Sequence, residues 1–272
     1  MRSFLFLLGL LVLTAQSAVA ATRAEIDALF DLLSMDTMLE VMQQEGIVYS
    51  DDLANELLPG GTNPAWQTIA RRIHDPERMS RVLRAEFDES LGDVDAAPLL
   101  NFFSSETGRE IVALELAARR AFIDQGFTDA ALEAFRAQEE PFDAHFDAIR
   151  GFVEANDLIE YNLSGALNSN YMFFRGLAEG GAINMSDEDI LAQVWAGEEM
   201  IRADTTEWLY AFLMVAYEPL SVETLNAYVA LSRSPSGRAL NRALFAGFDQ
   251  MYQAISLSLG LALARQLRGE TL

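Results

Sequence analysis

The sequence of 272 residues contains no cysteine and no lysine, and it has only two histidines, His74 and His145. Without cysteine there are no disulfides, thiol nucleophiles or thiolate metal sites, so the hydrophobic core must hold the folded chain together unaided. Without lysine there is neither a Schiff-base lysine nor a phosphate-loop lysine. Two histidines are too few for a three-histidine zinc site. The glycine patterns of hydrolase elbows and dinucleotide-binding loops are also missing. We therefore expect no catalytic residue, no cofactor and no bound metal.

Positive charge is scarce as well. The 19 basic residues, all arginine, stand against 41 acidic ones, and the formal net charge at pH 7 is −22. Such a surface repels nucleic acid and anionic lipid headgroups, so we expect no nucleic-acid partner. Cationic partners and divalent ions remain compatible with it, and the simplest interpretation is an acidic surface that favours solubility.

Residues 1–20 have the pattern of a secretory signal peptide. Arg2 supplies the positive charge, residues 4–13 are apolar except for Gly9, and residues 18–20 form a small-x-small cleavage site ending at Ala20. The alternative is a membrane anchor, but the apolar run is too short to cross about 30 Å of hydrocarbon. We expect cleavage near Ala20, a periplasmic or secreted protein, and no stable membrane insertion of the mature chain.

The remaining sequence indicates helices almost throughout, because helix-forming residues dominate and no long stretch alternates with period two. The fold class expected is therefore all-α. The first helix is expected over residues 23–44 and to end at Gly46, and Ser50 is expected to cap a short second helix. Pro141 predicts a break in a helical stretch of residues 128–157.

Two segments, residues 99–111 and 228–240, look like copies of one another. Such an internal repeat indicates that the chain consists of two related halves. In each copy a serine stands at an expected helix N-cap, and a glycine follows three residues later. Glycine inside a helix costs about 1 kcal/mol relative to alanine, so its presence in both copies suggests close passage of the preceding helix. The alternative is anion binding at the helix N-terminus beside the arginine. The matched residues are Ser105 with Ser234, Gly108 with Gly237, and Arg109 with Arg238.

The aromatic pair Phe102-Phe103 followed by Ser-x-x-Gly-Arg resembles the bacterial secreted family called domain of unknown function 2059, apparently in two tandem copies. The second copy departs from the family pattern, since Leu231-Ser232 replaces the aromatic pair. The resemblance implies an exported, all-helical protein. It implies no mechanism, because no activity is established for the family.

The repeat predicts a division into a signal peptide and two similar helical modules packed as one body. The boundaries expected are 1–20 for the signal peptide, 21–127 for the first module, 128–155 for a bridging helical segment and 156–272 for the second module.

One acidic neighbourhood contains a histidine. Asp143 and Asp147 flank His145 at spacings that could share a helical face, and carboxylates with an imidazole can bind a divalent ion. Di-metal helical bundles, however, take Glu-x-x-His pairs from facing helices, and this chain has a single such neighbourhood. We interpret it as a solvated acidic face with an isolated histidine.

Met172, Phe173 and Phe174 are candidates for the wall of an apolar pocket, although the same residues at helical spacing are ordinary core. The function expected is that of a non-catalytic periplasmic binding or structural module, with an unknown protein partner or a small apolar ligand. One alternative is a carrier or chaperone for an apolar ligand or an envelope protein. A second alternative is a carboxylate-based hydrolase, which would need two acids converging in a cleft.

Overall fold

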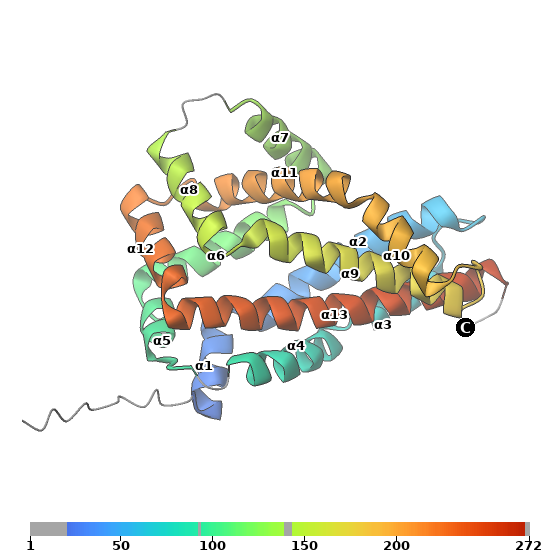
Figure 1. The fold of residues 1–272 in the computed structure, drawn as a ribbon, viewed down its shortest axis with the longest axis horizontal. Coiled ribbons are helices and arrows are strands. Elements are labelled where there is room, and N and C mark those ends of the chain that lie inside the picture. Colours follow the sequence, from blue (N-terminus) through green and yellow to red (C-terminus); the bar gives the residue numbers. More distant parts are fainter. Residues whose placement is uncertain (1–20, 92–93, 139–142, 270–272) are drawn as a thin grey trace, which may run out of the picture.

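The computed structural model describes residues 21–91, 94–138 and 143–269, and within these ranges the regular structure is entirely helical (Figure 1). The all-α class is therefore confirmed. The signal peptide with Ala20, and Pro141, lie outside the described residues. The helices are α1 (Arg23–Leu32), α2 (Met35–Leu57), α3 (Pro64–Ile73), α4 (Pro76–Leu91), α5 (Ala97–Phe103), α6 (Glu106–Ala121), α7 (Gln125–Arg136), α8 (Ala144–Ala155), α9 (Leu158–Glu179), α10 (Asp187–Ala196), α11 (Glu198–Tyr217), α12 (Val222–Arg233) and α13 (Pro235–Leu267).

The long helix α13 is the centre of the packing. Its 33 residues run beside α9 on one side and α4 on another (Figure 1). Glycines allow α9 and α13 to approach at backbone distance. A Cβ built on Gly260 would lie 2.2 Å from the Phe173 carbonyl oxygen, and one built on Gly176 would lie 2.5 Å from that of Leu257. No side chain fits between the helices at this crossing.

The largest hydrophobic core draws on both halves of the chain. Phe30, Trp66 and Phe87 of the N-terminal half belong to the same buried cluster as Met251 and Leu263 of α13. A second cluster joins α6 and α8 to α11 and α12, and a small third one joins α9 to α10. The ranges 21–127 and 156–272 thus share a core and form one body.

The two matched corners have the same N-caps. Ser105 precedes α6, and its hydroxyl accepts a hydrogen bond of 3.1 Å from the backbone N–H of Gly108. Ser234 precedes α13 and accepts one of 3.0 Å from the N–H of Gly237. Each hydroxyl satisfies one of the backbone donors that a helix start leaves unpaired.

The glycine of each corner faces the end of the preceding helix. A Cβ on Gly108 would lie 2.1 Å from the Phe102 carbonyl oxygen, and one on Gly237 would lie 2.0 Å from that of Leu231. In both corners the following arginine folds back and donates to a backbone carbonyl five residues earlier. The corners therefore share a local geometry, while a duplication of whole modules remains a prediction.

The N-terminal helices differ from the sequence-based expectation. The break falls at Leu33 and Ser34, where Ser34 adopts a left-handed φ of 53°, and α2 then continues through Gly46 to Leu57. The predicted helix end at Gly46 is wrong, and Ser50 lies within the helix with its hydroxyl donating to the Gly46 carbonyl at 2.6 Å. Gly46 is needed for packing, as described below.

Among the described residues, no helix combines the length and the apolar character required to cross a bilayer.

Candidate functional site

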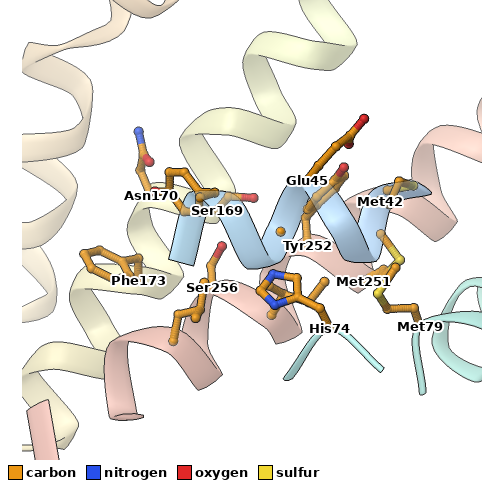
Figure 2. A pocket seen from close by; sticks show the side chains of 14 residues that line it. Met42, Glu45, His74, Met79, Ser169, Asn170, Phe173, Met251, Tyr252 and Ser256 are labelled. Atoms are coloured by element: carbon orange, nitrogen blue, oxygen red, sulfur yellow. The ribbon is translucent and has the colours of Figure 1, made fainter. Parts of the chain in front are cut away.

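A pocket of about 250 Å³ lies between α2, α9 and α13, with the end of α3 and the start of α4 closing one side (Figure 2). Tyr49, which is 57 % exposed, is among the residues that line it. Most of the wall is apolar and includes several flexible methionine side chains. The main apolar lining residues are Met42, Met79, Phe173, Met251, Ile255 and Leu259.

His74 is the most deeply buried polar group of this wall, with 4 % of its surface exposed. Its ring lies directly over Gly46, because a Cβ on that glycine would be 2.1 Å from Cδ2 and 2.4 Å from Nε2. The helical path of α2 past α3 therefore depends on glycine at position 46.

The hydrogen bonding of His74 defines its tautomer. Nδ1 lies 3.0 Å from the carbonyl oxygen of Ala70, and since a carbonyl can only accept, Nδ1 carries the proton. Burial lowers the pKa of His74, against a smaller raising effect of the Ala70 hydrogen bond, so the ring is neutral at pH 7. Nε2 then offers a lone pair, and it has no hydrogen-bond partner among the described residues. The pocket wall thus presents an acceptor that has no partner within the described part of the chain.

An ion pair borders the pocket. Arg119 binds the carboxylate of Glu45 through Nε at 2.8 and 3.1 Å and through Nη2 at 2.8 Å. Nη2 also approaches the Tyr252 hydroxyl at 3.4 Å. Both charged side chains are largely buried. Glu45, the one acid among the residues lining this pocket, is therefore neutralised and held in a bidentate geometry.

A second hollow of about 480 Å³ continues along α13 beyond the ion pair. It shares Met42, Ser169 and Tyr252 with the first pocket, and Arg119 contributes to its wall. Its acid, Asp249, already accepts hydrogen bonds from Asn168 at 3.1 Å and from Gln253 at 2.8 Å. The two hollows form one groove, apolar in most of its wall and divided by the Glu45–Arg119 pair.

The structure brings one of the three predicted apolar residues to this pocket. Phe173 lines it, whereas Met172 and Phe174 do not. Phe174 is partly buried and packs against the cores around α9 and α10. Sequence reasoning missed His74 and Tyr252. The available signal was Gly46, because a glycine inside a helical pattern often marks the close approach of another group.

His145 has a structural position away from this pocket. Its Nε2 lies 3.1 Å from the carbonyl oxygens of both Tyr217 and Leu220, so it donates to them and ties α8 to the turn after α11. Asp143 caps α8. The interpretation of His145 as an isolated, solvated histidine is wrong. Within the part of the chain that the structure describes, no group of three or more His, Cys, Asp or Glu side chains is placed to hold a metal ion.

Glu115 on α6 is a partly buried acid. Its carboxylate accepts a hydrogen bond of 2.7 Å from the Tyr217 hydroxyl. Burial raises the pKa of Glu115 to about 7, and hydrogen bonds from Tyr217 and Tyr228 oppose this rise without cancelling it. This carboxyl group changes charge close to neutral pH, and nothing in the local sequence indicates it.

Comparisons of the chain with protein-family models, with curated proteins and with solved structures give no match. The resemblance to domain of unknown function 2059 therefore stays a prediction.

Proposed function

We propose that this protein is an exported, non-catalytic binding protein that holds a small, largely apolar ligand with one hydrogen-bond donor in the pocket beside His74. The observation that carries the proposal is the unfilled Nε2 of His74 in a mostly apolar wall. A donor on a ligand would pair with this lone pair, and such a hydrogen bond contributes about 0.5–1.5 kcal/mol net.

The wall has the composition of a small-molecule site. Such sites are mainly apolar, with a few polar groups that orient the ligand. Methionine side chains adapt to ligands of differing shape, and three of them line this pocket: Met42, Met79 and Met251. This favours a carrier of an apolar ligand over a purely structural module.

The site offers less support for hydrolysis. A carboxylate-based hydrolase needs a free acid and a second acid or base converging on one bond. In this pocket Glu45 is already bound by Arg119, and the Nδ1 of His74 is bound by a backbone carbonyl. Export is supported by the signal-peptide pattern of residues 1–20.

The test uses N-phenyl-1-naphthylamine, a neutral fluorescent probe with apolar rings and a single N–H donor. His74→Phe keeps a flat ring but removes the acceptor. We expect it to weaken probe binding about 5- to 150-fold, the equivalent of about 1–3 kcal/mol. The compound 1-benzylnaphthalene lacks the N–H. Its affinity, measured by competition with the probe, should be equal in the parent and the variant.

Two neighbouring phenylalanines give a matched control. Phe173→Leu alters the pocket wall, whereas Phe174→Leu alters a partly buried residue of the same helix outside the wall. We expect the first change to weaken probe binding and the second to leave it intact. Equal probe affinity in the parent, His74→Phe and Phe173→Leu, with folding verified by circular dichroism, would refute the proposal.

A further inference from the structure

Helix α10 carries apolar side chains on two adjacent faces. Ile190 and Val194 point inward and pack with Leu163 and Leu167 of α9 in a buried cluster. On the outer face Leu191 and Trp195, four residues apart, are 46 % and 62 % exposed. The described part of the chain thus covers the first pair and leaves the second partly uncovered.

The exposed apolar surface extends over the bend into α11. Ala192 and Ala196 lie beside Leu191 and Trp195 and are also exposed. Met200, four residues after Ala196, is 66 % exposed. We call these five residues the α10 patch. Isolated exposed apolar residues are common, but several of them close together in the chain favour an interaction site.

The residues around the α10 patch are acidic. Glu188 precedes Leu191 by three positions on α10, and Asp204 follows Met200 by four on α11, so each lies next to a patch residue on its own helix. Glu199 directly precedes Met200 in the first turn of α11. All three carboxylates are exposed. The α10 patch therefore has an apolar centre and a negative rim.

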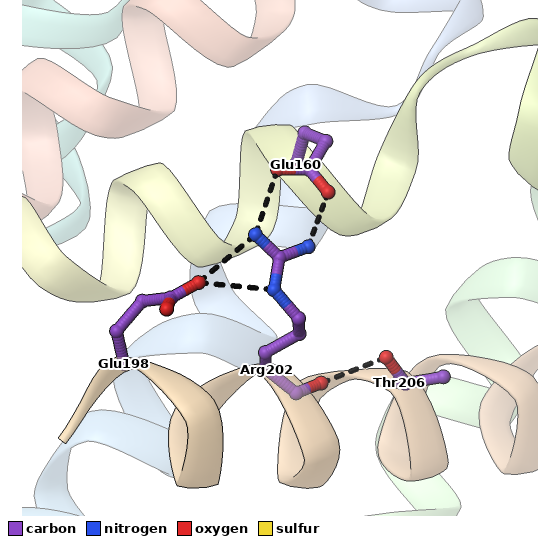
Figure 3. A network of polar contacts seen from close by, with 4 residues as sticks. All are labelled: Glu160, Glu198, Arg202 and Thr206. Carbon is purple, nitrogen blue, oxygen red and sulfur yellow. Dashed lines mark hydrogen bonds and ion pairs between the residues drawn. The ribbon is translucent and has the colours of Figure 1, made fainter.

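The arginines near this corner are already paired. Arg202 donates to Glu160 on α9 and to Glu198 at the start of α11, the latter at 3.0 Å (Figure 3). Arg175 on α9 donates to Glu179 at 2.7 Å. These pairs neutralise the neighbouring positive charge, and the pair with Glu160 joins the start of α11 to α9. The rim thus keeps its negative charge on a corner that is tied to the body.

We propose that the α10 patch docks a basic amphipathic segment of a partner protein. The apolar residues of that segment cover Trp195 and Leu191, and its lysine or arginine side chains face Glu188, Glu199 and Asp204. Tryptophan is enriched among the residues that dominate binding energy. A second copy of this chain fits poorly because its own patch has the same negative rim, and an anionic membrane is repelled for the same reason.

The probe is a synthetic amphipathic helical peptide of leucine and lysine. A serine–lysine peptide of equal charge controls for non-specific attraction to an acidic protein. Binding is followed by titration calorimetry and by tryptophan emission. The emission reports on the patch because Trp66 is fully buried and Trp208 is less exposed than Trp195. We expect the leucine–lysine peptide to bind with a blue shift, and the serine–lysine peptide to bind at least about tenfold more weakly, since the apolar centre supplies most of the affinity.

Variants locate the binding. Trp195→Ser should weaken the leucine–lysine peptide at least about tenfold, as expected of a central aromatic anchor. The control Phe127→Ser removes another partly exposed ring, on α7, and should have no effect. Leu191→Ser serves as a second patch variant if Trp195→Ser folds poorly.

The triple change Glu188→Gln, Glu199→Gln and Asp204→Asn should weaken binding and reduce its salt dependence. The matched change of exposed acids elsewhere is Glu106→Gln, Glu110→Gln and Glu133→Gln.

Four results would overturn the proposal. They are equal binding of the two peptides, equal affinity of the parent and the patch variants, self-association in sedimentation that Trp195→Ser abolishes, and binding to phosphatidylcholine–phosphatidylglycerol vesicles that Trp195→Ser abolishes. The third result would assign the patch to a second copy of the chain, and the fourth to a membrane surface.

Discussion

The imidazole of His74 occupies the space that a side chain at position 46 would need. A Cβ on Gly46 would lie 2.1 Å from His74 Cδ2, well inside van der Waals contact. Because the ring is fixed by its hydrogen bond to Ala70 and is almost fully buried, it has little freedom to move aside. This contact both allows α2 to continue past α3 and sets one wall of the pocket.

Gly46→Ala should therefore lower the melting temperature, even though alanine is the better helix former. In a His74→Ala background the overlap is gone, and the same change should become neutral or stabilising by up to about 1 kcal/mol. Denaturant unfolding of the four proteins measures the coupling. If Gly46→Ala has the same effect in both backgrounds, the two residues are not in contact.

The corner glycines should not tolerate even a methyl group. The overlap at Gly108 and Gly237 is with backbone atoms of the preceding helix, which cannot rotate away. We expect Gly108→Ala and Gly237→Ala each to cost at least about 1–3 kcal/mol of unfolding free energy. Gly151, in α8, has no atom within 4 Å of a built Cβ, so Gly151→Ala should instead stabilise by up to about 1 kcal/mol. Similar effects at all three positions would contradict the close approach.

Glu115 should make stability depend on pH. Its folded-state pKa is about 7, raised by burial from 4.5. Below pH 4.5 both states are protonated. Between 4.5 and 7 the unfolded state ionises first, so the contribution of this group to stability falls as the pH rises. Glu115→Gln cannot ionise.

As the pH rises from 5 to 8, the melting temperature of Glu115→Gln should therefore rise relative to that of the parent. Glu110→Gln, an exposed change on the same helix, should show no such shift. A difference for Glu115→Gln that does not vary with pH would show that the carboxyl group is well solvated.

His145→Ala should destabilise the junction of α8, α11 and α12. The carbonyl oxygens of Tyr217 and Leu220 would both lose their donor from His145, at a cost of about 1–3 kcal/mol. His145→Gln, which keeps a side-chain N–H donor, should recover part of that loss. Thermal melts of both variants measure it, and equal melting temperatures for alanine and glutamine would show that the hydrogen bonds contribute little.

The sequence by itself determined the helical class and two helix starts. Ser105 and Ser234 both cap the helices that follow them. These contacts join groups within three or four residues of one another, so the local sequence is sufficient to predict them.

Only the tertiary structure decided where the pocket lies. Position 46 of α2 requires glycine because His74, at the C-cap of α3, fills the space beside it, and that contact spans 28 positions of the chain. Phe173 lines the pocket while Phe174, also partly buried, packs against the cluster between α9 and α10. Consecutive residues of a helix point about 100° apart, and only the packing of α9 on α13 fixes which one faces the groove. The raised pKa of Glu115 likewise depends on burial beside Tyr217 and Tyr228, which lie about a hundred residues further along the chain.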